Sequence, residues 1–156
     1  MAVPQHVARV SKTYAPYGYS IMEDVATSLG GSLTETGGNF YVGLFDDADV
    51  IVESASISWI SNNSTAANHG YIGLDYSDND GLNSNSVQLV PNASRTDTWN
   101  ATTAAATVPE KFHSLALTQP ALVPKGKMLY VRVQDAGGAA WVASRPVFRA
   151  RIRRKA

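Results

Sequence analysis

Residues 127–133, with the sequence KMLYVRV, form the stretch that decides the fold class. Leu129, Val131 and Val133 alternate with the other residues, so they point to one side of an extended chain and can bury one face of a strand. The preceding residues 124–126, PKG, suit a tight turn, because Pro fixes φ and Gly can adopt a positive φ. We therefore predict a β-strand over residues 127–133.

The same period of two recurs along most of the chain, together with the β-branched and aromatic residues that strands favour. It predicts further strands at residues 39–45, 50–60, 71–76, 86–90, 113–118, 139–143 and 146–152. With residues 127–133 these segments make about eight strands. Within residues 50–60 one predicted face consists of Ile51, Ala55, Ile57 and Trp59. Within residues 86–90, Val87 and Leu89 are expected to share a side.

One segment has the pattern of a helix. Ser20 and Glu23 have the spacing of a capping box, in which the hydroxyl and the carboxylate satisfy the first free amides of a helix. The apolar residues that follow fall on one helical face, and Gly30 with Gly31 would end the helix. We therefore predict a short helix over residues 20–29.

The connections between the predicted strands are too short and too weakly helical for parallel crossovers. The sequence therefore predicts an all-β protein, an antiparallel β-sandwich that is jelly-roll-like, with one short helix and long loops. Residues 1–18 contain two Pro and one Gly and show no regular period, so we expect an extended N-terminal arm there. The sandwich domain is expected to span residues 19–156.

Composition excludes several kinds of protein. The chain has 156 residues and no Cys, which excludes disulfides, thiolate metal sites and Cys nucleophiles. No run of 18 apolar residues occurs, so a transmembrane helix is not expected. The first residues lack the pattern of a secretory signal, and we expect none.

Charge is segregated along the chain although the formal net charge is zero. Between Thr13 and Ser94 there is no Lys or Arg, whereas Asp and Glu are frequent. Most bases follow Arg95. Such a split indicates either an acidic and a basic face, which would suit association, or acidic and basic strands that neutralise each other within one fold.

The basic C-terminal segment is the main candidate for partner binding. A strand there would send Phe148, Ala150 and Ile152 to one face and a ladder of arginines to the other, a spacing suited to carboxylates or phosphates. The candidate contact residues are Arg145, Arg149, Arg151, Arg153, Arg154 and Lys155. Because the chain is neutral overall, an acidic protein surface is favoured over nucleic acid as the partner. The other interpretation is a solvated or internally paired edge strand, whose charge blocks strand-to-strand aggregation.

Other candidate chemistry is sparse. His6, His69 and His113 are far apart in sequence and belong to no catalytic or metal-binding motif, so we expect no enzyme activity and no cofactor. The acidic segments 75–83 and 46–49 contain the oxygen ligands that Ca²⁺ prefers, but they lack the EF-hand register and are better explained as turns. Trp99 is the candidate for stacking on a sugar ring, whereas Trp59 and Trp141 lie in strand patterns and are expected to be buried.

The segment 117–133, LTQPALVPKGKMLYVRV, is a turn followed by a strand, and it resembles segments of small structural proteins from tailed-phage virions, especially head decoration or cement proteins. The absence of Cys, the expected arm and the loops rich in Ser, Thr and Asn extend this resemblance of architecture over most of the chain. The resemblance implies a sandwich, jelly-roll or β-tulip domain, commonly trimeric, that clamps neighbouring capsid subunits. The same segment is equally similar to strands of sugar-binding sandwiches.

Two functional hypotheses follow. The first is a non-enzymatic decoration protein on the capsid surface of a virion, which binds the major capsid protein and further copies of itself as a trimer, without membrane or nucleic-acid partners. The second is a carbohydrate- or receptor-binding module of a phage fibre or tail. A neighbouring gene for a major capsid protein or for a tail fibre would discriminate between them.

Overall fold

The computed structural model describes residues 12–14, 20–78, 80, 84–98 and 112–155. It confirms the predicted all-β class, because the described residues form antiparallel strands and one short 3₁₀ turn, η1 (Asn92–Ser94). The strands form two main sheets and a small third sheet. The division into an arm at residues 1–18 and a domain from residue 19 stays a prediction, since most of the arm lies outside the described residues.

The first sheet has the strand order β1-β2-β14-β5-β10, and β11 also pairs with β5. The second sheet has the order β4-β12-β7-β8, and β9 also pairs with β7; the third sheet is β3-β13-β6. The strands of the first sheet are β1 (Lys12–Tyr14), β2 (Ser20–Ser28), β5 (Val50–Ser58), β10 (His113–Ser114), β11 (Leu122–Val123) and β14 (Val147–Lys155). Those of the second are β4 (Gly38–Phe45), β7 (Gly70–Asp78), β8 (Val87–Gln88), β9 (Thr96–Asp97) and β12 (Lys127–Asp135). The third contains β3 (Ser32–Thr34), β6 (Ser61–Asn62) and β13 (Val142–Ser144).

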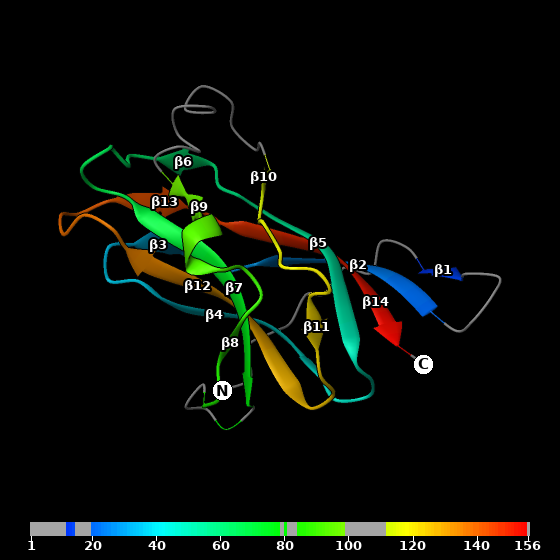
Figure 1. Ribbon diagram of the computed structural model, residues 1–156. Coiled ribbons are helices and arrows are strands. Elements are labelled where there is room, and N and C mark those ends of the chain that lie inside the picture. The colour runs from blue at the N-terminus through cyan, green and yellow to red at the C-terminus, as the bar shows by residue number, and fades with distance from the viewer. Residues whose placement is uncertain (1–11, 15–19, 79, 81–83, 99–111, 156) are drawn as a thin grey trace.

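The pairing is nested, as in one long hairpin that is rolled up. β2 pairs with β14, β3 with β13, β4 with β12, β5 with β11 and β10, and β7 with β9 and β8, always antiparallel. The roll closes where β14 also pairs with β5 and β12 also pairs with β7. Figure 1 shows the two resulting layers, with β2, β14 and β5 in one and β4, β12 and β7 in the other. This is the jelly-roll arrangement of eight strand positions in two sheets.

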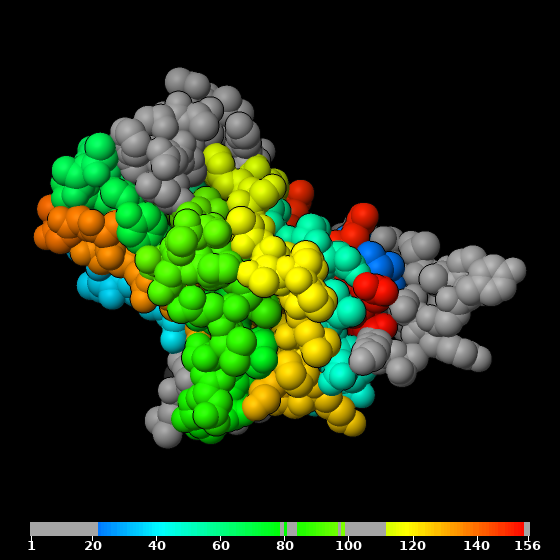
Figure 2. Space-filling view, in the orientation of Figure 1, coloured from blue at the N-terminus to red at the C-terminus, as the bar shows by residue number. Residues whose placement is uncertain are grey.

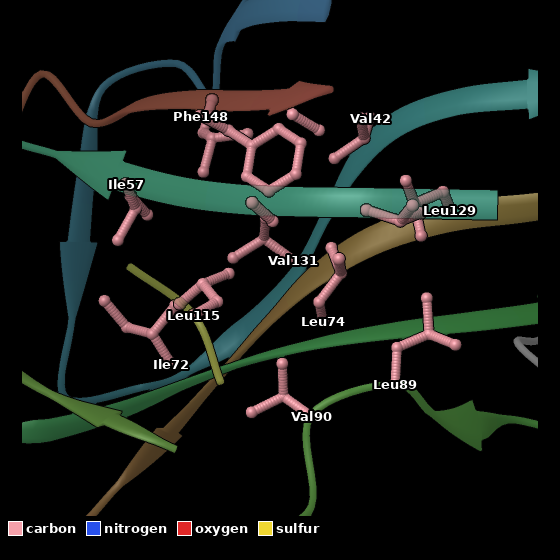
Figure 3. Packing of buried hydrophobic residues seen from close by; sticks show 14 of the residues in the cluster. Val42, Ile57, Ile72, Leu74, Leu89, Val90, Leu115, Leu129, Val131 and Phe148 are labelled. Carbon is pink, nitrogen blue, oxygen red and sulfur yellow. The ribbon is translucent and has the colours of Figure 1, made fainter. Parts of the chain in front are cut away.

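The hydrophobic core lies between these two sheets. β14 contributes Phe148, Ala150 and Ile152, and β12 contributes Leu129, Val131 and Val133, all of them buried, as the alternation predicted. Figure 3 shows Phe148 and Ile57 facing the residues of the opposite sheet. Leu115, Leu89 and Val90 lie in segments outside the long strands and complete the same cluster. The inward faces of both sheets are therefore occupied by one apolar core, which leaves the two outward faces as the flat surfaces of the molecule.

The predicted helix over residues 20–29 is wrong, because residues 20–28 form the strand β2. All nine residues of β2 pair with β14, so ladder hydrogen bonds and packing outweigh a helical pattern of moderate propensity. Glu23, expected as a helix cap, is instead buried on β2 and paired with Arg154. Gly30 has a positive φ of 82°, which serves the turn after the strand.

Two predicted strand faces also differ from the structure. Between Arg151 and Ile152 the register of β14 against β5 shifts, so that Glu53 is an extra residue in a β-bulge. As a result Val50 and Val52 are buried together with Ala55 and Ile57, and Ile51 does not share their face. In the segment 86–90, Val87 is 43% exposed while Leu89 is buried, because the strand ends at Gln88 before Leu89 turns into the core.

Candidate docking surface on the first sheet

The arginine-rich strand β14 lies in the middle of the first sheet, between β2 and β5. Its inward residues are fixed by the core, so its outward residues Arg149, Arg151 and Arg153 form a ladder on the outer face, as predicted. Acidic residues of the first half of the chain lie on the two neighbouring strands. The segregated charges of the sequence are therefore brought together by the strand order.

Two arginines of the ladder are paired with these acids. Arg151 Nε lies 3.1 Å from Asp24 Oδ1 on β2, directly across the strand pair. Arg153 Nε lies 2.6 Å from Glu53 Oε1, the residue that the bulge in β5 adds. Both pairs are partly exposed, so each contributes little to the free energy of unfolding. Internal pairing is thus present at these two positions, but the interpretation as an edge strand is wrong, because β14 is paired on both sides.

Arg154 points away from the ladder, to the side on which Ile152 is buried. Its Nε lies 3.1 Å from Oε1 of the buried Glu23, and its guanidinium also pairs with Asp47. The guanidinium carbon lies 5.8 Å from the centre of the Phe45 ring. Arg154 therefore ties β14 to β2 and to the turn after β4 at one end of the sandwich.

Arg149 differs from its neighbours in the ladder. Small residues flank it on both strands, Ala26 on β2 and Ser56 on β5, and no described carboxylate pairs with it. Its guanidinium carbon lies 4.0 Å from the centre of the Phe112 ring, a cation–π contact that orients the group. The ladder therefore ends in an exposed, oriented cation.

A shallow groove of about 410 Å³ runs beside this cation over the outer face. Its lining residues are Asp24, Val25, Ala26, Ser54, Ser56, Arg149, Ala150 and Arg151. A guanidinium next to serine hydroxyls can bind a carboxylate or a phosphate through charge-assisted hydrogen bonds. Asp24 and Arg151 also line the groove and pair with each other, so Arg149 is the cation of this lining that has no described carboxylate partner.

The other predicted contact residues lie at the ends of β14. Arg145 stands in the turn between β13 and β14 with a positive φ of 51°, and its amide donates a hydrogen bond to the carbonyl of Gly31 at 3.0 Å. Lys155 is the last residue of β14 and pairs with Ser20 of β2. Trp99, the candidate for sugar stacking, lies outside the described residues. Of the predicted set, the structure brings Arg149, Arg151 and Arg153 onto one face and separates Arg145 and Arg154 from it.

Among the described residues, the remaining aromatic and histidine candidates pack within the fold, whereas His6 lies outside the described residues. Trp59 and Trp141 are buried, as expected, and the ring of His113 stacks on Trp59 with a centroid distance of 5.0 Å. His69 is buried and meets the edge of Tyr71 at 5.3 Å. No group of three or more metal-binding side chains occurs among the residues that the structure describes. No described helix is long and apolar enough to cross a lipid bilayer.

Part of the outer face of the second sheet, around Tyr130 and Arg132, is covered, which the sequence did not indicate. The segment after β7 lies against it: Ser86 hydrogen-bonds to the Tyr130 hydroxyl, and Asn92 accepts two hydrogen bonds of 3.2 Å from Arg132. In Figure 2 the green atoms of this region lie beside the yellow atoms of the segment that contains β10 and β11, which pair with β5 of the first sheet. On the outer face of the first sheet, Arg149 and Arg151 are exposed.

Under this cover lies a buried ion pair. Asp75 Oδ2 on β7 is 2.8 Å from Arg132 Nε on β12, and these two side chains are 2% and 12% exposed. The side chain of Arg132 can extend over β7 toward Asp75 because its cross-strand partner there is Gly73, which has no side chain. A Cβ on Gly73 would stand 3.0 Å from Arg132 Nη2. Burial raises the pKa of Asp75, and the nearby Arg132 lowers it only in part. Asp75 is therefore the ion-pair partner of Arg132 in the second sheet, and residues 79 and 81–83 of the acidic segment 75–83 lie outside the described residues.

The fold and surface define a jelly-roll β-sandwich whose outer face on the first sheet is charged. Neither a protein-family model nor a curated protein matches the chain. Among solved structures, the chain is similar to a chain in a structure of infectious bursal disease virus, Gx strain, with a TM-score of 0.36 and 9% sequence identity. That match covers 96% of this chain and 42% of the viral chain.

Proposed function

We propose that this protein is a non-enzymatic structural component of a virus particle, a decoration or cement protein that binds the capsid surface and associates with copies of itself as a trimer. The observation that carries the proposal is the outer face of the first sheet, on which a paired charge ladder ends in the exposed Arg149. The jelly roll supplies a rigid platform for that face, and the sequence resemblance to phage decoration proteins points in the same direction.

The chemistry of docking follows from the ladder. Arg151 and Arg153 are held by their carboxylate partners, so they lose little side-chain entropy when a second surface covers them. Arg149 then receives a carboxylate of the capsid protein in the groove beside Ser54 and Ser56. Each copy buries a modest area, and the symmetry of the shell multiplies the effect.

Co-sedimentation with capsid shells of the virus that encodes the chain tests this proposal. We expect the native protein to pellet with the shells and the Arg149→Glu variant to bind at least about tenfold more weakly, because a close charge pair is replaced by repulsion. Arg145→Glu, in the turn before β14, is the matched control and should bind like the native protein. Sedimentation equilibrium tests the trimer. A protein that stays monomeric at high concentration and does not bind shells would refute the proposal.

The second candidate function, a receptor-binding module of a fibre or tail, is supported by the same groove. The carboxylate of an acidic sugar fits the guanidinium of Arg149 and the hydroxyls of Ser54 and Ser56. Trp59 and Trp141 are buried and offer no stacking surface for a neutral sugar. A glycan array in which acidic glycans bind the native protein and not Arg149→Glu would favour this function, and an array without signal would exclude it.

A further inference from the structure

The strand β4 forms a long edge of the second sheet, and no described strand pairs with its outer side. β4 has eight residues and pairs with β12 on one side alone. The edge strands β8, β9, β10 and β11 have two residues each, and β2 is partly covered by β1. Unpaired N–H and C=O groups along such an edge are a template for the addition of another strand.

The sequence of β4, GNFYVGLF, does not protect this edge. Natural edge strands are blunted by charges, by Pro or by short length. Apart from a bulge at Val42, between the pairs Leu129↔Gly43 and Tyr130↔Tyr41, β4 carries none of these devices. Its Tyr41 is 42% exposed. The edge therefore combines free backbone groups with an apolar, uncharged surface.

A groove of about 330 Å³ lies directly beside this edge, where the margins of the two sheets face each other. β4 forms one wall and β2 with β14 forms the other. The lining residues are Glu23, Val25, Tyr41, Val42, Gly43, Leu44, Phe45, Asp46, Ile152 and Arg154. The floor is thus apolar, and charged residues stand at one end.

The charged end has an excess of carboxylates. Glu23, Asp46 and Asp47 stand against the single guanidinium of Arg154, which already pairs with Glu23 and Asp47. Asp46 is exposed and forms no ion pair with a described cation, because Arg154 pairs with Glu23 and Asp47. A positively charged side chain at this end would therefore be attracted, and an acidic one repelled.

We propose that the groove between β2 and β4 is a strand-addition site that takes an extended segment of a partner protein. The segment pairs its backbone with the free edge of β4 and places alternate apolar side chains on the groove floor. A Lys or Arg at one end of the segment reaches Asp46. The site lies apart from the charge ladder and does not depend on the proposed function.

The test uses a blocked heptapeptide of alternating Val and Thr that ends in Arg-Lys, with hydrogen exchange of the β4 amides as the readout. We expect the peptide to slow the exchange of these amides at least about tenfold, because added ladder bonds must open before exchange. A peptide with Pro at alternate positions cannot donate those bonds and should give no protection. A peptide that ends in Glu-Glu should bind about two- to fivefold more weakly than the Arg-Lys peptide.

Variants of the protein distinguish peptide binding at the β4 edge from nonspecific binding. Tyr41→Lys places a charge on the edge and should abolish binding, whereas Ile60→Lys, at a site 48% exposed outside the groove, should leave it unchanged. If Tyr41→Lys does not fold, Asp46→Asn should lower affinity for the Arg-Lys peptide alone, with no effect on an uncharged peptide. Unchanged β4 exchange with every peptide would overturn the proposal. Protection of β4 by concentration-dependent dimerisation, without peptide, would assign the edge to a second copy instead.

Discussion

Replacement of Arg132 by Met tests whether the second sheet depends on its buried ion pair. The Met side chain keeps much of the aliphatic volume but removes the guanidinium 2.8 Å from Asp75. Asp75 is then a buried carboxylate that keeps the Ser86 hydroxyl at 3.5 Å and the electrostatic influence of Arg95. Removal of one partner from a buried pair costs about 3–5 kcal/mol. Because Arg132 is 12% exposed and partly solvated, we expect the lower end, about 3 kcal/mol near pH 7.

The destabilisation caused by Arg132→Met should depend on pH, and the pKa of Asp75 sets the direction of this dependence. Burial raises the pKa of Asp75 in the folded protein, and Arg132 opposes that rise, so the variant should raise the pKa further. A carboxyl whose folded pKa lies above its unfolded value favours the folded state below the unfolded pKa, and this contribution is lost as pH rises through the folded pKa. The cost of Arg132→Met should therefore shrink toward pH 4, where Asp75 can take up a proton.

Urea denaturation at pH 7 and pH 4 measures the effect as a change in midpoint at constant m-value. The double variant Asp75→Asn with Arg132→Met removes both charges and is the control; it should recover most of the stability at pH 7. A loss for Arg132→Met below about 1 kcal/mol, or one that is equal at both pH values, would refute the reasoning about a desolvated pair.

Three further predictions concern other parts of the sandwich. Phe148→Ala should lower the free energy of unfolding by about 3–5 kcal/mol in urea titrations, because the ring is fully buried between the sheets. Gly70→Ala should cost about 1–3 kcal/mol by the same assay, since a Cβ there would stand 2.3 Å from the Trp141 ring. Hydrogen bonds from the Trp141 indole and the Gly138 amide lower the pKa of Asp135 in the folded protein. Ionised Asp135 therefore stabilises the fold above its unfolded pKa, and this contribution is lost as pH falls through the folded pKa. Asp135→Asn should therefore have a lower melting temperature than the native protein at pH 7, and the two should converge in acid.

The strands that were predicted correctly share a clear alternation over an unbroken ladder. Residues 127–133 and 146–152 lie on central strands, where one face is buried along its whole length, and their sequence period therefore survives in the structure. β5 contains a bulge at Glu53, which a strict period of two cannot represent. The sequence of β2 predicts a helix because its apolar spacing fits both periods. The partner that decides for a strand, β14, lies more than a hundred residues away in the chain.

The candidate site was predictable in its residues and not in its geometry. The alternation in residues 146–152 was sufficient to place Arg149 and Arg151 on an outward face. The acids that pair with them are set by the strand order, which pattern analysis does not give. Nothing in the sequence indicates that the Phe112 ring orients Arg149, because a single aromatic residue before a short strand is compatible with many surroundings. The split of charge along the chain was the one clue that acids and bases would meet.

That split is a consequence of the rolled hairpin. A jelly roll pairs early strands with late ones, so a chain with acids early and bases late brings opposite charges together on neighbouring strands. At Arg151, for example, the two residues directly opposite are Asp24 on β2 and Ser54 on β5, so no like charge faces the arginine. The ladder stays balanced until Arg149, where Ala26 and Ser56 replace the expected acids. No described carboxylate stands beside Arg149, so it is the position of the ladder at which the proposed binding of an external anion can be tested without disturbing an internal ion pair.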